Sequence, residues 1–226
     1  MKHSKKVWYA PNKHEAYGEE EIKAVEQCLR DGWLAGFGPR SVEFEEKIAK
    51  EFGKKYGVFV NSGSSACLLS LAALDLPKGT KVLTPALTFS TTLAPIIQLG
   101  YVPVFIDSNL TSYVPDIDDI IEAITDDIKV IMIPNLIGNK PNWKKLKDEL
   151  FKINRSDIYL IEDSADTVTY TKESDVSTTS FYASHVITAG GMGGMVMFND
   201  EKHVKRALMY RDWGRIGDNS ENMDER

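Results

Sequence analysis

Apolar and polar positions alternate along the chain with two periods. Residues 18–31 and 41–52 show the three- and four-residue spacing of amphipathic helices, and Ile22, Val25 and Leu29 form the stripe of the first. Short apolar runs bounded by Gly, Pro or Asp have the length of β-strands. We predict strands at 56–60, 81–85, 102–106, 129–134, 158–161, 179–183 and 194–198, and further helices at 66–74, 90–99, 143–152 and from about 200.

Strands that alternate with helices in this way predict an α/β fold with a mostly parallel sheet. The run Val130-Ile131-Met132-Ile133 has no polar position. Such a strand is typical of a sheet that helices cover on both faces. The pattern therefore predicts a three-layer sandwich.

Composition excludes several classes of function. The chain has 226 residues, 42% hydrophobic and 27% charged, with a formal net charge of −6. A mildly acidic chain lacks the basic surface that nucleic acid or an anionic membrane requires. No run approaches the roughly 20 apolar residues of a membrane span, and no apolar signal segment follows the basic first residues. Cys28 and Cys67 alone make neither a disulfide framework nor a metal site, so we expect reduced thiols in a cytoplasmic protein.

The segment Asn61 to Ser65 joins a predicted strand to a predicted helix through small residues. Free backbone N–H groups at a helix N-terminus, together with the helix dipole, bind phosphate. The hydroxyls of Ser64 and Ser65 add two donors. Taken alone, the segment is better read as an ordinary turn, because most small-residue turns between a strand and a helix bind nothing.

Asp163 and Phe89 also follow predicted strands. Ligands of open α/β sheets gather at the carboxyl ends of the strands. A carboxylate there can pair with a protonated ring nitrogen, as in pyridoxal phosphate enzymes, and an aromatic ring can stack on a flat cofactor. The alternatives are a loop or capping acid for Asp163 and a core side chain for Phe89.

His185 lies between Ser180-Phe181 and a loop with four glycines in five residues, Gly190 to Gly194. Glycines permit backbone conformations and close approaches that other residues forbid. The hydroxyl of Ser180 can donate to a phosphate. A histidine imidazole exchanges protons readily near neutral pH, which suits a general acid–base.

These segments together resemble the DegT/StrS type of sugar aminotransferases, a family of fold-type-I pyridoxal phosphate enzymes. The matching stretches are Gly36-Phe37-Gly38-Pro39, Val60 to Ala66, Thr84-Pro85 through Phe89, Glu162-Asp163-Ser164, Ser180-Phe181 and Gly193-Gly194. The resemblance implies the large domain of an aspartate aminotransferase-like fold. It implies that Gly63, Ser64 and Ser180 hold the cofactor phosphate, that Phe89 stacks on the ring, and that Asp163 pairs with the ring nitrogen. It places Asp166 near the ring hydroxyl.

The resemblance also implies a domain division. Residues 1–35 form an N-terminal segment and residues 36–215 the cofactor-binding large domain. Residues 216–226 begin the connection to the smaller C-terminal domain that the family carries.

The chain departs from the aminotransferases at one position. Their Schiff-base lysine follows the Ser-Phe pair, and here that position is His185. The lysines after Asp163, namely Lys172, Lys202 and Lys205, do not have the required spacing. The stretch from Ser180 to Thr188 and Asp212-Trp213-Gly214-Arg215 resemble the sugar 3-dehydratases, which make this exchange. No cysteine follows Cys67, so we expect no iron–sulfur cluster.

The resemblance thus predicts a dehydratase that uses pyridoxal 5′-phosphate or pyridoxamine 5′-phosphate. We expect it to remove the 3-hydroxyl of a 4-keto-6-deoxy nucleotide sugar, GDP-4-keto-6-deoxymannose, in deoxysugar and lipopolysaccharide O-antigen biosynthesis. His185 would be the acid–base, glutamate the amine donor, and the assembly a homodimer. The alternatives are a nucleotide-sugar aminotransferase, a cofactor-binding member without catalysis, and a non-catalytic interaction domain.

Overall fold

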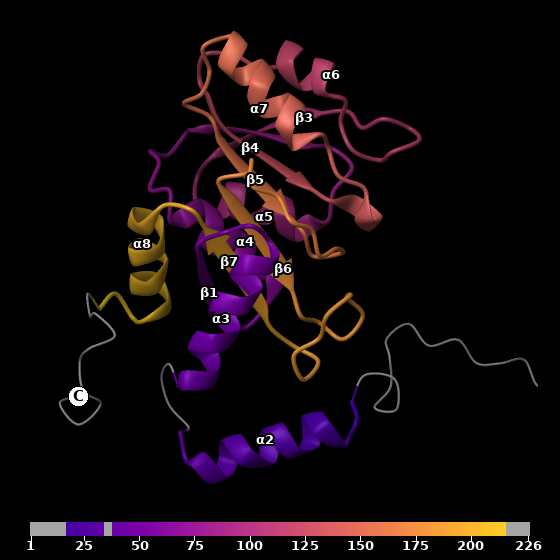
Figure 1. The fold of residues 1–226 in the computed structure, drawn as a ribbon. Helices are drawn as coiled ribbons and strands as arrows, with labels where there is room; N and C mark the ends of the chain where they lie inside the picture. The colour runs from indigo at the N-terminus through magenta and orange to yellow at the C-terminus, as the bar shows by residue number, and fades with distance from the viewer. Residues whose placement is uncertain (1–16, 34–37, 216–226) are drawn as a thin grey trace, which may run out of the picture.

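The fold is a seven-stranded sheet between two layers of helices in a computed structural model that describes residues 17–33 and 38–215 (Figure 1). The strands lie in the order β1-β7-β6-β5-β4-β2-β3. Neighbours pair in parallel, except that β7 is antiparallel to both β1 and β6. The predicted α/β class with a mostly parallel sheet is confirmed. The strands are β1 (Tyr56–Val60), β2 (Lys81–Pro85), β3 (Val102–Ile106), β4 (Ile128–Pro134), β5 (Tyr159–Asp163), β6 (Val176–Ser180) and β7 (Gly194–Phe198).

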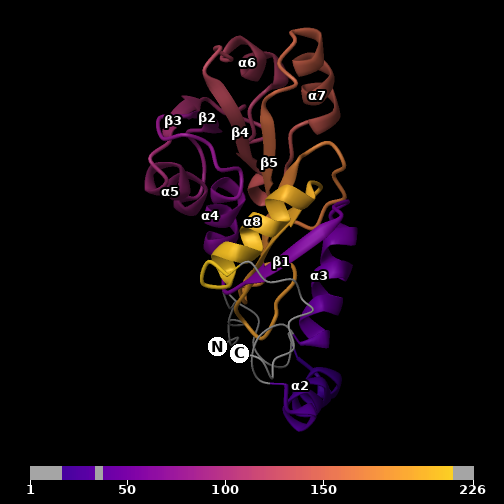
Figure 2. The ribbon, with the colours of Figure 1, turned by 90° about the vertical axis from the view of Figure 1, so that its left-hand side faces the viewer.

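Helices cover both faces of the sheet, as Figure 2 shows in side view. Side chains of α4 (Gly63–Ala72), α5 (Ser90–Gln98) and α8 (Glu201–Arg211) join the core cluster on one face. Those of α3 (Pro39–Glu51), α6 (Ile117–Glu122) and α7 (Trp143–Lys152) join two clusters on the other. Within β7, Val196 belongs to the first face and Met197 to the second, since side chains alternate along a strand.

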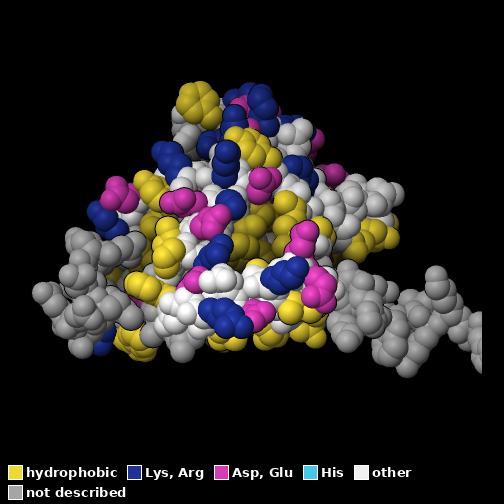
Figure 3. Space-filling view, turned by 60° about the horizontal axis from the view of Figure 1, so that its bottom comes forward, with side chains coloured by type: hydrophobic (Ala, Val, Ile, Leu, Met, Phe, Trp, Pro, Cys, Tyr) yellow, Lys and Arg dark blue, Asp and Glu magenta, His cyan; other side chains and the backbone are white. Residues whose placement is uncertain are grey.

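Helix α2 (Glu19–Asp31) forms where the sequence predicts it, but none of its residues is buried. Its apolar stripe is open: Ile22 is 55% exposed, Val25 63% and Leu29 65%. Figure 3 brings this end of the molecule forward and shows hydrophobic side chains among charged ones. Across the described ranges, every helix is too short or too polar to cross a membrane.

Some element boundaries differ from the sequence prediction. Helix α4 begins at Gly63, three residues early, because the Ser62 hydroxyl caps it by accepting a hydrogen bond from the Ser65 N–H at 3.1 Å. The strand predicted at 179–183 is wrong: β6 spans Val176–Ser180. The hydroxyls of Ser177, Thr178 and Thr179 are buried and donate hydrogen bonds to β5 and to the loop that follows it. Because these residues are polar, the hydropathy pattern did not indicate a buried strand. The helix α6 and the 3₁₀ turn Leu136–Gly138 had no predicted counterpart.

Candidate active site

One edge of the sheet gathers all the candidate residues. The carboxyl ends of β1, β2, β5 and β6 point the same way, because these strands are parallel to one another through β4 and through the two antiparallel pairings of β7. Gly63 and Ser64 follow β1, Phe89 follows β2, Asp163 ends β5, and Ser180 ends β6. The amino end of β7 lies at the same edge. Topology therefore brings together segments that span more than a hundred residues of sequence.

The N-terminus of α4 packs directly against the end of β6. A Cβ atom built on Gly63 would lie 2.7 Å from Cβ of Ser180 and 3.2 Å from its Oγ. A Cβ on Gly194 would lie 2.3 Å from the carbonyl carbon of Ser62. Only glycine fits at either position, so the glycine loop, the α4 N-terminus and the Ser180 hydroxyl form one cradle with N–H and O–H donors.

Asp163 is 7% exposed and receives four donors. Thr92 Oγ1 donates to Oδ2 at 2.7 Å and Cys67 Sγ at 3.5 Å, while the Ala165 N–H donates to Oδ1 at 3.2 Å and Thr178 Oγ1 at 3.4 Å. Burial raises the pKa of this carboxyl above its ordinary 3.8, and the donors oppose the rise. A cationic partner at this edge would offset the cost of burying the ionised carboxylate.

Phe89 stands at the start of the helix that carries Thr92. Its carbonyl accepts from the Thr92 N–H at 3.0 Å, and its side chain is 68% exposed. The core alternative for Phe89 is therefore wrong, because a core side chain would be buried. The exposed ring immediately precedes α5, and Thr92 in the first turn of α5 donates a hydrogen bond to Asp163. An exposed ring at this position could stack on a flat cofactor.

His185 lies on a loop whose backbone is fixed by hydrogen bonds. The Phe181 N–H donates to the Gly193 carbonyl at 2.9 Å, and the Ala183 N–H donates to the Gly191 carbonyl at 3.1 Å. The His185 N–H closes a turn onto the Tyr182 carbonyl at 3.0 Å. The imidazole Nδ1 lies 3.2 Å from Oδ1 of Asp166, which comes from the loop after β5.

The lysines after Asp163 lie away from this edge or are otherwise engaged. Lys172 is exposed, with its Nζ 5.5 Å from the centre of the Tyr170 ring. Lys202 and Lys205 are on α8, where Lys205 pairs with Glu201 at 2.7 Å. Nothing in these contacts aims an amine at the edge that holds Asp163 and His185.

A second polar cluster supports the same edge from the opposite face of the sheet. Glu162 is fully buried and accepts hydrogen bonds from Asn135, Thr171 and Ser177 at 2.8–2.9 Å. Asn135 also donates to Ser164 Oγ at 2.7 Å, and its N–H donates to the Asp163 carbonyl at 2.8 Å. Three bonds from one side chain and its backbone thus tie the end of β4 to the Glu162-Asp163-Ser164 segment.

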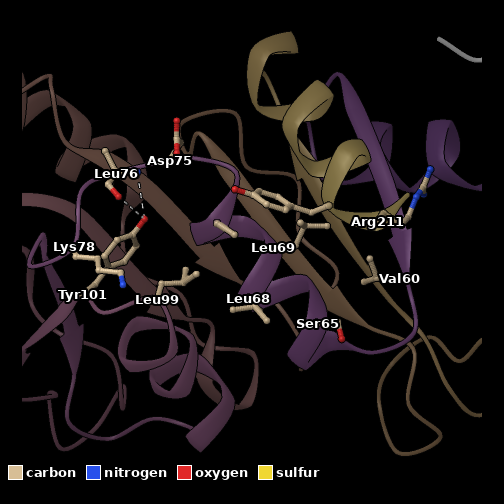
Figure 4. A pocket seen from close by; sticks show the side chains of 12 residues that line it. Val60, Ser65, Leu68, Leu69, Asp75, Leu76, Lys78, Leu99, Tyr101 and Arg211 are labelled. Carbon is tan, nitrogen blue, oxygen red and sulfur yellow. Dashed lines mark hydrogen bonds between the residues drawn. The ribbon is translucent and has the colours of Figure 1, made fainter. Parts of the chain in front are cut away.

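A cavity of about 520 Å³ lies beside α4 (Figure 4). Leu68, Leu69 and Ala72 line it from α4, and Tyr101 from across the cavity. The Tyr101 hydroxyl is held by the N–H and the carbonyl of Leu76, each at 3.2 Å. Its lining is largely apolar and includes neither Asp163 nor His185, but Val60 and Ser65 line it from the end of β1 and the start of α4.

The residues present fit a phosphorylated pyridine cofactor. The cradle supplies N–H and O–H donors beside close contacts that only glycine allows, and a buried carboxylate lies at the same edge. Among the described residues, Thr88 Oγ1, next to Phe89, is buried without a hydrogen-bond partner. The fold, together with the polar residues at the carboxyl ends of its parallel strands, is that of the large domain of a fold-type-I pyridoxal phosphate enzyme.

The family assignment follows from residues 15–225, which match the model of the DegT/DnrJ/EryC1/StrS aminotransferase family. The chain belongs to this family. Pyridoxal phosphate or pyridoxamine phosphate is the cofactor of the family and is bound in solved relatives.

Three similar proteins show the extent of the match. Lipopolysaccharide biosynthesis protein RfbH of Salmonella typhimurium is 36% identical over 91% of this chain and 49% of its own length. GDP-4-keto-6-deoxy-D-mannose 3-dehydratase of Escherichia coli O55:H7 is 34% identical over 86% of this chain and 53% of its own. A crystal structure of GDP-4-keto-6-deoxymannose-3-dehydratase with a trapped PLP-glutamate geminal diamine superposes with a TM-score of 0.82 at 30% identity, over 92% of this chain and 55% of that one. The chain spans about half the length of the curated relatives it matches.

Proposed function

We propose that this chain is the cofactor-binding part of a pyridoxal phosphate- or pyridoxamine phosphate-dependent 3-dehydratase. Its substrate is a 4-keto-6-deoxy nucleotide sugar, GDP-4-keto-6-deoxymannose, and glutamate is its amine donor. The observation that carries the proposal is His185, an imidazole held at the edge where aminotransferases place their lysine. Relatives with 3-dehydratase names support the choice.

Different residues bind the phosphate, the ring face and the ring nitrogen of the cofactor. Gly63, Ser64 and Ser180 hold its phosphate through the cradle at the N-terminus of α4. Phe89 stacks on the ring, and Asp163 pairs with the ring nitrogen through a carboxylate that Thr92 orients. The bound cofactor supplies an amine for the sugar ketone and a ring that accepts electrons.

His185 moves the proton. With the cofactor bound, the His185 imidazole would act as the base that accepts a proton and then as the acid that delivers it to the hydroxyl on sugar carbon 3, which would leave as water. An imidazole returns a proton more readily than a lysine amine, and it forms no covalent bond with the cofactor aldehyde. General acid–base help of this kind contributes about 10²–10⁴-fold to a rate.

The test is incubation of the purified protein with pyridoxamine phosphate, glutamate and a panel of 4-keto-6-deoxy nucleotide sugars. Mass spectrometry is expected to show a product that has lost the 3-hydroxyl oxygen. In His185→Asn this product should disappear while pyridoxamine phosphate still binds. Borohydride treatment of the pyridoxal phosphate form should leave no cofactor fixed to the protein.

A nucleotide-sugar aminotransferase is the second candidate, because GDP-perosamine synthases are also among the relatives. An amino sugar in the same assay, or cofactor trapped on a lysine by borohydride, would establish it and overturn the dehydratase. A protein that binds pyridoxamine phosphate but alters no sugar of the panel would instead be a cofactor-binding member without this catalysis. We also propose a homodimer, which light scattering on the purified protein tests directly.

A further inference from the structure

Asp166 contacts the imidazole of His185 through one specific nitrogen. Its Oδ1 lies 3.2 Å from Nδ1, and the side chain of His185 is 22% exposed. Resemblance to the family implies that Asp166 lies near the hydroxyl of the cofactor ring, and in the structure its carboxylate lies beside the histidine. The contact joins the loops that follow two neighbouring parallel strands, β5 and β6.

The backbone around both residues is already fixed. The Ser164 N–H donates to the Thr178 carbonyl at 2.8 Å, and the Ala165 N–H donates to Asp163 Oδ1 at 3.2 Å. On the other side, the His185 N–H closes its turn onto Tyr182. These backbone bonds fix the position of the His185 backbone, but they determine neither the side-chain χ angles nor which ring nitrogen carries the proton. The contact between Asp166 Oδ1 and Nδ1 can determine both.

A neutral imidazole carries its proton on one nitrogen and a lone pair on the other. A carboxylate close to Nδ1 stabilises a proton on that nitrogen, because the negative charge attracts the N–H dipole. The lone pair then lies on Nε2, and Nε2 becomes the atom that accepts and returns a proton. In the Ser-His-Asp triads a carboxylate hydrogen-bonded to Nδ1 fixes the tautomer of the catalytic histidine, and here the Asp166 carboxylate lies 3.2 Å from the same atom.

We infer that Asp166 is a positioning residue that keeps His185 in the Nδ1-protonated tautomer and presents Nε2 as its proton-carrying atom. The role of this atom in hydroxyl loss rests on the proposed function. The tautomer itself does not, since it is a property of the protein without cofactor or substrate.

The direct test is nitrogen NMR of the cofactor-free protein with ¹⁵N-labelled histidine rings, at a pH where the imidazoles are neutral. The chain has four histidines, and comparison with His185→Asn identifies the His185 signals. In the unmodified protein, Nδ1 is expected to show the shift of a protonated nitrogen and Nε2 that of a lone-pair nitrogen. In Asp166→Ala the two shifts should approach each other as both tautomers become populated.

Asp126→Ala is the matched control, because it removes the same charge from an exposed site at the amino end of β4, opposite the candidate edge. It should leave the His185 shifts unchanged. Identical His185 shifts in the unmodified protein and in Asp166→Ala would overturn the inference. A fall in pyridoxamine phosphate affinity with unchanged shifts would overturn it too and would make Asp166 a cofactor ligand.

An activity measurement separates this inference from the proposed function. In the pyridoxamine phosphate-loaded enzyme, Asp166→Ala is expected to slow hydroxyl loss by roughly 10- to 100-fold, within the about 10²–10⁴-fold that general acid–base help contributes in full. Asp166→Glu should restore part of the rate. Shifted NMR signals with no hydroxyl loss in any form would reject the proposed function alone, whereas hydroxyl loss with unshifted signals would reject the positioning role alone.

Discussion

The hydroxyl of Thr92 donates a hydrogen bond of 2.7 Å to Oδ2 of Asp163 and so links α5 to the end of β5. Both groups are buried, Thr92 fully. Phe89 is the N-cap residue of the same helix, so one short segment carries both the exposed ring and the hydroxyl that orients the carboxylate. The candidate site is therefore set by how α5 packs on the sheet.

Replacing Thr92 with valine keeps its shape and removes this donor. We expect Thr92→Val to weaken pyridoxamine phosphate binding by roughly 10-fold, because a hydrogen bond to a charged group is worth about 1.5–3 kcal/mol. The pKa of Asp163 should rise further, since one of the donors that favour its ionised form is lost. Fluorescence titration with pyridoxamine phosphate measures the affinity. Thr91→Val changes the neighbouring residue in the same way and should bind as the unmodified protein does.

Asp163→Asn is expected to change two properties that can be measured independently: the pH dependence of the free energy of unfolding and the affinity for pyridoxamine phosphate. Burial raises the pKa of Asp163 in the folded protein above 3.8, so the folded state holds the proton more tightly than the unfolded state. The stability that the protonated Asp163 carboxyl contributes is therefore lost as the pH rises from about 4. The variant has no such loss, so its free energy of unfolding should fall less steeply than that of the unmodified protein as the pH rises from about 4.

Urea unfolding at several pH values measures this difference, with Asp126→Asn as a surface control that should follow the unmodified protein. The same Asp163→Asn variant should lose most of its affinity for pyridoxamine phosphate. A variant that binds normally would show that Asp163 does not pair with the ring nitrogen.

The strands could be predicted from sequence because most of them are apolar on both faces. Val130 to Ile133 predicted β4 correctly, and a covered parallel sheet requires such runs. Strand β6 was misplaced since Ser177, Thr178 and Thr179 read as polar. Their hydroxyls are buried only because they bond to Glu162, Asp163 and the Ser164 carbonyl, which are distant in sequence.

The site could be predicted in part. Asp163 and His185 were proposed from segments that resemble a known family, and the structure brings both to one edge of the sheet, Asp163 at the end of β5 and His185 on the loop after β6. Thr92 and Cys67 were not found, because a hydroxyl or a thiol inside a helix has no signal of its own. Their roles appear only when packing sets α4 and α5 beside the end of β5. The contact of Asp166 with His185 likewise depends on how two loops fold.

Gly63→Ala should disturb the cradle. The added Cβ would lie 2.7 Å from Cβ of Ser180, which is closer than real contacts allow. We expect a loss of about 1–3 kcal/mol in the free energy of unfolding, as for other overpacked sites, and weaker binding of pyridoxal phosphate. In the double variant Gly63→Ala/Ser180→Gly the clash disappears, so stability should return while cofactor binding stays weak, because the Ser180 hydroxyl is gone. Stability that stays low in the double variant would place the clash elsewhere.

Lys54 makes the stability of the protein depend on pH at the alkaline end. The side chain is 6% exposed, and its ammonium donates to the carbonyl of Thr171. Burial lowers its pKa from 10.5 to about 8, although the nearby Glu162 opposes the change. The folded state therefore binds fewer protons than the unfolded state between about pH 8 and 10.5, and stability should rise with pH across this window.

Lys54→Met removes the titrating group and keeps much of the apolar stem. Compared with the unmodified protein, it should lack a gain of about 3 kcal/mol between pH 8 and 10.5, since each pKa unit corresponds to about 1.4 kcal/mol. Urea unfolding at pH 7.5, 9 and 10.5 measures the difference between the two proteins, so that other groups titrating in the same range cancel. Lys55→Met alters the neighbouring, exposed lysine and should leave the slope unchanged. Parallel curves for Lys54→Met and the unmodified protein would mean that the Lys54 ammonium reaches solvent despite its buried position beside Glu162.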